Sequence, residues 1–186
     1  MRRLPKLPIP ETVTRMHDDR ADHDHHDDTN IPRLFEVTLG GADNESEIVP
    51  LMVAFNEDEG ITWKPETMIP ALRQLLNEPA TGLVLLARDP LSGAAAGYGI
   101  VTFGFDIEFS GRDAFLTELF VESSYRGRGV GRHLMDALLS TLQARGINAV
   151  HLMVRPENAP ARALYESLDF RAVPRQLMTK RLSPVW

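Results

Sequence analysis

A glycine-rich turn over residues 126–131, reading Arg-Gly-Arg-Gly-Val-Gly, constrains the fold more than any other feature of the chain. It separates an apolar run over 114–121 from an amphipathic run over 130–145. A turn that leads from a strand into a helix leaves backbone N–H groups unpaired at the positive end of the helix dipole. Because glycine lacks a Cβ, an anion can approach this main chain closely. The turn therefore predicts a strand–turn–helix unit that binds a pyrophosphate.

Spacing argues against the commoner phosphate motifs. A Walker loop needs lysine and then serine or threonine after its last glycine, but Arg132 and His133 follow here. The dinucleotide pattern G-x-G-x-x-G also fails, because position 132 is arginine. An RNA-binding Arg-Gly segment is disfavoured by the acidic balance, 20 Lys+Arg against 26 Asp+Glu, and by the lack of interleaved aromatic residues. A polar turn without a ligand is the simple alternative.

Together with its flanks, the remaining pattern R-x-x-G-x-G resembles the GNAT superfamily of acyl-CoA-dependent N-acetyltransferases. The run Leu119-Phe120-Val121 is similar to that family's fourth strand, which holds the pantetheine arm of the cofactor. Downstream, the chain has the family's fifth strand and asparagine, and then its N-x-x-A-x-x-L-Y-E helix, in the residues Val154-Arg155-Pro156-Glu157-Asn158, Ala161, Leu164-Tyr165-Glu166 and Phe170. The resemblance covers residues 114 to about 182.

One residue departs from the family pattern, since Asp169 stands where glycine is usual. The position follows a helix and favours left-handed backbone geometry, which aspartate tolerates better than most residues. We therefore expect a modest stability cost at Asp169 and no loss of function.

The resemblance also implies how the co-substrate binds. Acetyl-CoA would lie with its pyrophosphate on the turn and its pantetheine along the preceding strand. The implied binding residues are Leu119, Phe120, Val121, Arg126, Gly127, Arg128, Gly129, Val130, Gly131 and Asn158. A backbone N–H near Phe120 or Val121 would hold the oxyanion as the amine attacks the thioester directly. From spacing alone, Asn158 could simply cap the helix that follows it.

Two residues are candidates for proton transfer. Tyr165 would by its pattern be a core aromatic residue, but the resembled family has a tyrosine there that points at the thioester sulfur. We therefore interpret Tyr165 as the general acid for the departing thiolate. Glu118 lies inside an otherwise apolar strand, where a carboxylate is costly unless it faces water or a cation. It belongs either to an exposed strand face or to the site, as general base for the amine; a water relay is the alternative base.

The patterns predict one α/β domain over residues 33–186 behind a disordered polar tail over residues 1–32. The resemblance implies a mixed, mostly antiparallel sheet, splayed between its fourth and fifth strands, with helices on both faces. The strands are expected at 35–39, 83–87, 97–105, 115–121 and 149–154, with two more through Leu182, and the helices at 45–56, 65–77, 129–145 and 159–167.

Composition limits the setting of this domain. No run approaches the ~18 apolar residues of a membrane helix, and the chain has neither cysteine nor a secretory apolar region, so we expect a cytoplasmic protein. The histidines of the tail match no defined zinc spacing, and no structured metal site is expected.

The acceptor is the least defined part of the prediction. Acidic residues at 57–59, 106 and 108 are either solvated loops or a rim that attracts a cationic amine, with Trp63 and Tyr98 as aromatic walls. The favoured function is acetyl transfer to a primary amine of a small molecule or of a protein or peptide, without a nucleic-acid or membrane partner. The alternative is a catalytically silent acyl-CoA-binding regulatory module, which the presence of both Glu118 and Tyr165 disfavours. The sequence leaves homodimer formation open.

Overall fold

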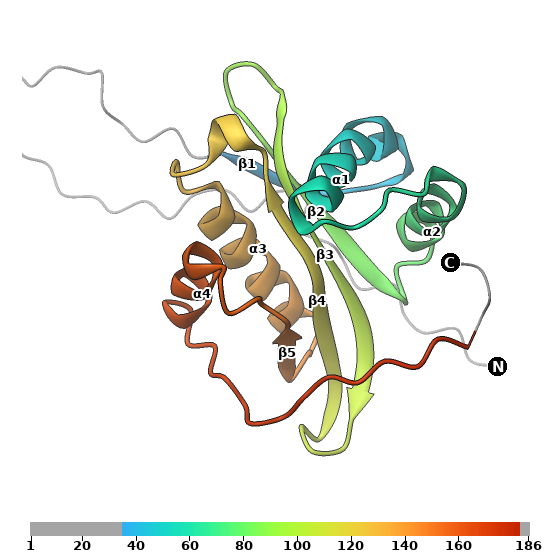
Figure 1. The fold of residues 1–186 in the computed structure, drawn as a ribbon, viewed down its shortest axis with the longest axis vertical. Coiled ribbons are helices and arrows are strands. Elements are labelled where there is room, and N and C mark those ends of the chain that lie inside the picture. The colour runs from blue at the N-terminus through green and yellow to red at the C-terminus, as the bar shows by residue number, and fades with distance from the viewer. Residues whose placement is uncertain (1–34, 183–186) are drawn as a thin grey trace, which may run out of the picture. The chain divides into compact units, whose positions relative to one another are not determined.

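The computed structural model describes residues 35–182, in two compact units that meet in the chain between Met153 and Val154. The expected tail over residues 1–32 lies outside the described residues. The first unit contains the sheet of Figure 1 with three α-helices, and the second contains one helix. The elements of the first unit are β1 (Glu36–Leu39), η1 (Ala42–Asn44), α1 (Glu45–Glu59), α2 (Pro65–Asn77), β2 (Gly82–Arg88), β3 (Ala95–Asp106), β4 (Gly111–Val121), η2 (Ser123–Tyr125), α3 (Val130–Ala144) and β5 (Ala149–Leu152). The helix of the second unit is α4 (Ala159–Glu166).

The sheet has the order β1-β2-β3-β4-β5, antiparallel throughout except for the parallel pair of β4 and β5. That last pairing joins 113–116 only to 149–152, so β4 continues over 117–121 past the end of β5. The predicted mixed, mostly antiparallel sheet is therefore confirmed, and so is its splay between β4 and β5.

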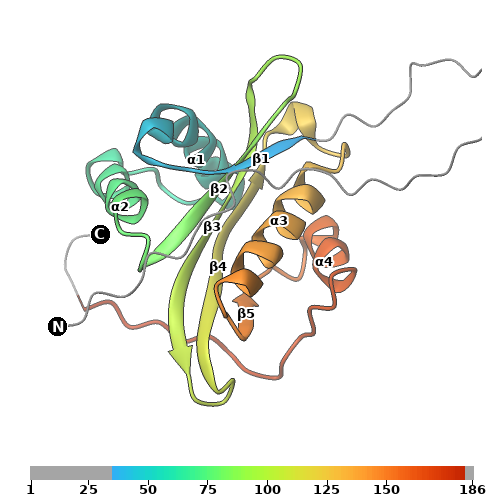
Figure 2. The same cartoon turned by 180° about the vertical axis from the view of Figure 1, so that it is seen from behind.

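Helices cover both faces of the sheet, as the opposite views of Figures 1 and 2 show for α1 and α2 on one side and α3 on the other. The α3 helix buries apolar residues at four-residue spacing, which are Val130, Leu134, Leu138 and Leu142. A Cβ at Gly97 would lie 3.3 Å from Leu134 and 2.5 Å from a carbonyl of β4, so the glycine allows close packing. The core on the other face comprises Ile48, Leu51, Met52, Leu72, Val84, Leu86, Tyr98, Ile100 and Phe120.

A β-bulge in β4 changes which residues face each layer. The register pairs Ile100 with Glu118 but Val101 with Leu116, so Thr117 is the extra residue. The Thr117 hydroxyl donates a hydrogen bond to the Ile100 carbonyl at 3.2 Å. Paired residues share a face, so Leu116 faces the α3 layer with Val101, whereas Glu118 faces the α1 and α2 layer with Ile100.

The second unit confirms one expectation and corrects another. Asp169 follows α4 with φ 64°, the left-handed geometry expected there. The expected C-terminal strands are wrong, since no strand is present over 171–182. Pro174 has no N–H for a ladder, and the apolar residues of this segment do not alternate as those of a half-buried strand do. No helix within residues 35–182 is long and apolar enough to cross a bilayer.

Candidate active site

The glycine turn has the geometry of an anion site. It leads from β4 through η2 into α3, and its backbone is left-handed at Gly127 (φ 74°) and at Gly129 (φ 85°), the N-cap of α3. Neither a side-chain cap nor an acidic residue of the first turn occupies the N–H groups at the start of α3. These groups and the helix dipole therefore give this end of α3 a positive field that can receive a phosphate oxygen.

The arginines of the turn are fixed by protein groups. The Arg126 Nε donates to the Val121 carbonyl at 3.0 Å, and its guanidinium pairs with Asp58 and lies over the Phe120 ring at 5.5 Å. Arg128 is 5.3 Å from the centre of the Phe35 ring and 3.4 Å from an Asp89 carboxylate oxygen. Both side chains are half-exposed, so they add charge to the turn while their contacts restrain them.

Glu118 forms a pair with Tyr98 that the sequence analysis did not foresee. The Tyr98 hydroxyl donates to Glu118 Oε2 at 2.5 Å, and the Tyr98 side chain is fully buried. Burial raises the pKa of the Glu118 carboxyl, and the hydrogen bond from Tyr98 lowers it only in part. Burial and the neighbouring Glu118 carboxylate raise the pKa of Tyr98 well above its ordinary value, so the phenol stays a donor. One signal could have revealed the pair: a tyrosine and a glutamate in adjacent predicted strands, each needing a polar partner.

Glu118 lines an open cavity of about 360 Å³ whose walls are residues of α1, α2 and the sheet. The exposed strand face considered for Glu118 is therefore wrong, because the residue is half-buried beneath these helices. The other residues that line the cavity are Met52, Met68, Ala71, Leu72, Gln74, Leu75, Thr81, Ile100 and Thr102.

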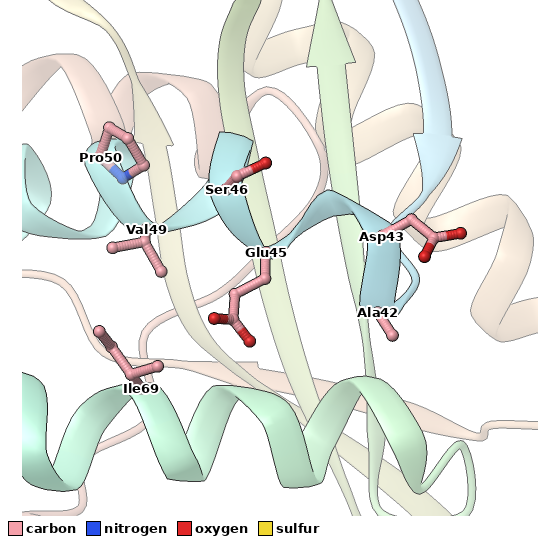
Figure 3. A pocket seen from close by; sticks show the side chains of 7 residues that line it. All are labelled: Ala42, Asp43, Glu45, Ser46, Val49, Pro50 and Ile69. Carbon is pink, nitrogen blue, oxygen red and sulfur yellow. The ribbon is translucent and has the colours of Figure 1, made fainter.

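A second hollow, of about 480 Å³, lies between the start of α1 and α2 (Figure 3). Glu45 points from α1 toward α2 in it, and Arg73 binds both carboxylate oxygens, at 2.6 and 2.7 Å. None of the predicted site residues lines this hollow. Its central carboxylate is neutralised by an ion pair, and we assign it no catalytic role.

The two acidic groups considered for the acceptor rim lie in different places. Asp58, near the end of α1, pairs with Arg126 of the turn. Asp106 belongs to the β3–β4 hairpin, where its carboxylate accepts from the Glu108 N–H at 2.8 Å. Arg126, the partner of Asp58, also binds the Val121 carbonyl, and Val121 pairs with Gly97 beside Tyr98 in β3. Asp106 ends that strand, and at about 3.3 Å per residue it lies roughly 25 Å along β3 from Tyr98. The structure thus does not join the two groups into one rim.

Tyr165 and Asn158 belong to the second unit. Asn158 caps α4, since its side-chain oxygen accepts from the Ala161 N–H at 3.2 Å, which confirms the capping role. The Tyr165 ring lies 5.8 Å from that of Phe170, at an interplanar angle of 60°. The roles of Tyr165 and Asn158 toward the co-substrate stay predictions. Within residues 35–182 no cluster of acidic residues and histidines could hold a metal ion, and the histidines of the tail lie outside that range.

Comparisons with known proteins agree with this geometry. The model of the acetyltransferase (GNAT) family matches residues 48–170. A mycothiol acetyltransferase of Beutenbergia cavernae is 47% identical over 64 residues, which are 33% of this chain and 22% of that protein. A [ribosomal protein bS18]-alanine N-acetyltransferase of Escherichia coli K12 is 43% identical over 58 residues, 31% of this chain and 39% of that protein. The chain thus spans well under half the length of these relatives.

A solved structure supports the same fold. The crystal structure of a probable acetyltransferase superposes with a TM-score of 0.71 over 80% of this chain and 98% of its own, at 19% identity. At that identity the likeness bears on the fold alone.

Proposed function

We propose, from the premise that this chain belongs to the GNAT acetyltransferase family, that it transfers an acetyl group from acetyl-CoA to a primary amine. The observation that carries the proposal is the course of β4, which presents the half-buried Glu118 and then leads through η2 into the glycine turn at the start of α3. The names of the relatives, a mycothiol and a ribosomal-protein-alanine acetyltransferase, support acetyl transfer to an amine of a small molecule or of a protein.

The co-substrate would bind through main-chain groups. The N–H groups over 127–131 would hold the pyrophosphate, and Arg126 and Arg128 would add charge beside it. The pantetheine would lie along 119–121, where β4 has passed the end of β5 and no longer pairs with it. A backbone N–H of Phe120 or Val121 would then donate to the thioester oxygen, on which negative charge develops.

Two side chains would manage the protons. The pKa of an alkylammonium is near 10.4, about 3.4 units above pH 7. Removing its proton at pH 7 therefore costs roughly 4.6 kcal/mol, which the site must offset. Glu118, ionised above its raised pKa, would accept this proton, and Tyr98 would hold the carboxylate in place. Tyr165 would donate a proton to the departing CoA thiolate.

The acceptor would be an amine that is cationic before it reacts. Glu118 is the one ionisable residue among those that line the cavity, and its negative charge attracts an ammonium at short range. Electrostatic attraction from more distant acids is screened over about 8 Å at physiological salt. The cysteine-free composition supports action in the cytoplasm.

A thiol-release assay with acetyl-CoA and a panel of primary amines tests this function. We expect amine-dependent release of CoA that is reduced about 10²–10⁴-fold in Glu118→Gln and in Tyr165→Phe. Calorimetry with CoA run alongside distinguishes the alternatives. CoA binding without turnover for any amine would indicate a silent regulatory module, and absence of CoA binding would refute the assignment of the turn.

A further inference from the structure

We propose that the cavity beside Glu118 binds an apolar substituent of the acceptor, so that the preferred substrate is a primary amine with a short hydrocarbon tail rather than a polyamine. The inference rests on the proposed function, in which the amine nitrogen binds at the Glu118 carboxylate. It adds the chemical class of the group attached to that nitrogen.

The lining of the cavity is the first argument. Apolar side chains come from both helices and the sheet: Met52 from α1, Met68, Leu72 and Leu75 from α2, and Ile100 from β3. A volume of about 360 Å³ lies at the lower end of the range for ligand pockets. Such a cavity has room for one small substituent, and its mostly apolar lining favours an apolar one.

The distribution of charge is the second argument. Glu118 is the one ionisable side chain among the residues that line the cavity, and Tyr98 already donates to its Oε2. Oε1 can therefore accept a hydrogen bond from one ammonium or amine group. A second ammonium in the cavity would contact mostly thioether and aliphatic groups. The polar lining residues Gln74, Thr81 and Thr102 carry no negative charge, so its desolvation would be compensated only in part.

The methionines are the third argument. Met52 and Met68 lie on different helices and contribute to the same lining. Methionine is flexible and polarizable, so it adapts to apolar groups of different shape. The cavity should therefore accept both straight-chain and aromatic tails, with the charge on the amine kept at the Glu118 end.

Calorimetry with two matched amines tests the cavity directly. Hexylamine and cadaverine are equal in chain length, but cadaverine carries a second ammonium where hexylamine ends in a methyl group. We expect wild-type protein to bind hexylamine at least about tenfold more tightly, because only hexylamine places a hydrocarbon end among the apolar side chains. Equal affinities, tighter binding of cadaverine, or no binding of hexylamine would overturn the proposal.

Filling the cavity locates the binding. Ala71 is exposed on α2 and lines the cavity, so Ala71→Phe should fill the space without disturbing the core. Hexylamine affinity should fall about tenfold or more in this variant, with CoA affinity unchanged. Ala144→Phe, at an exposed position of α3 away from the cavity, is the control and should bind like wild type. Unchanged hexylamine affinity in Ala71→Phe would show that the amine binds elsewhere.

Turnover separates this inference from the proposed function. With acetyl-CoA, hexylamine should have the higher kcat/KM, and Ala71→Phe should remove that advantage. If hexylamine binds as expected but no amine is acetylated, the transfer function fails and the apolar amine pocket stands. If Ala71→Phe instead lowers kcat/KM only for hexanoyl-CoA as acyl donor and leaves acetyl-CoA and the amines unaffected, the cavity holds the acyl chain and the inference is wrong.

Discussion

The turn over residues 126–131 would bind acetyl-CoA and the cavity beside Glu118 would bind the amine, but the two regions are built differently. The turn offers backbone N–H groups whose direction is set by two left-handed glycines and a helix start. The cavity is formed by side chains from two helices and from separate strands of the sheet. A backbone site can thus be encoded in six consecutive residues, whereas a side-chain cavity depends on residues more than sixty positions apart, such as Met52 and Glu118.

The largest expected effect is a loss of CoA affinity caused by a substitution in the turn, with amine binding in the cavity retained. Gly129→Val introduces a β-branched residue at φ 85° and a side chain beside the N–H groups, so CoA affinity should fall about 100-fold or more. Calorimetry with CoA and with hexylamine measures both regions in one protein, and amine binding should persist.

Gly146→Val is the matched control for this strain. Gly146 also has a left-handed φ of 69°, but it follows the other end of α3, about 25 Å away along the helix. The control should lose thermal stability to a similar degree and keep its CoA affinity. Wild-type CoA affinity in Gly129→Val would refute the pyrophosphate site.

The next largest effect is a loss of kcat caused by a substitution in the cavity. Glu118→Gln keeps the shape of the side chain but removes the base, so kcat should fall about 10²–10⁴-fold while CoA affinity stays within about twofold. Glu66→Gln, at an exposed position early in α2, is a control for loss of charge. If kcat in Glu118→Gln falls less than about threefold, a water relay is the base.

A smaller effect concerns how kcat/KM for the amine depends on pH, through the pKa of Glu118 in the cavity. The Tyr98 hydroxyl lowers the pKa of Glu118 by donating to its carboxylate, against the upward effect of burial. In Tyr98→Phe the pKa of Glu118 should therefore rise further. Because the base must be ionised, the acidic limb of the kcat/KM profile for the amine should move to higher pH. An unmoved limb, or one that persists in Glu118→Gln, would assign this titration to another group.

The smallest effect lies outside both regions. Asp169→Gly replaces a residue held at φ 64° with one that adopts this geometry freely, which should raise stability by about 0.5–1 kcal/mol. The ion pair of Asp169 with Arg171 is exposed and offsets little of this gain. Chemical denaturation measures the change, while both ligand affinities should stay at wild-type values. A change in either affinity would show that the region after α4 affects the site.

The same contrast explains which features could be predicted from sequence. The helix over 65–77 and the glycine turn depend on local patterns, and the structure has each where the sequence predicts it. The left-handed position at Asp169 follows from the glycine that the resembled family has there, and it is confirmed as well. The two C-terminal strands expected through Leu182 disregard the local evidence of Pro174, and they are absent from 171–182.

The cavity could not be predicted because its chemistry arises from tertiary contacts. Glu118 was recognised as unusual in an apolar strand, but its burial depends on α1 and α2, and its hydrogen bond depends on the register with β3. The pairing of Asp58 with Arg126 joins residues 68 positions apart, which no local spacing encodes. Local rules describe backbone geometry well and contain little information on which distant side chains meet.

The extra residue at Thr117 makes β4 sensitive to changes in length. Because side chains alternate along a strand, the bulge lets Leu116 face α3 while Glu118 faces α1 and α2. Substitutions at Thr117 would keep these orientations, and so would deletion of Thr117 itself, because it would leave a regular ladder in which Leu116 and Glu118 still face opposite layers. Insertion of one residue, or deletion of one elsewhere within 114–120, would instead turn one half of β4 onto the wrong face. Apart from loss of Thr117, genetic variation in this strand is therefore expected to occur by replacement of residues, with insertions and deletions confined to the hairpin and the turn that flank it.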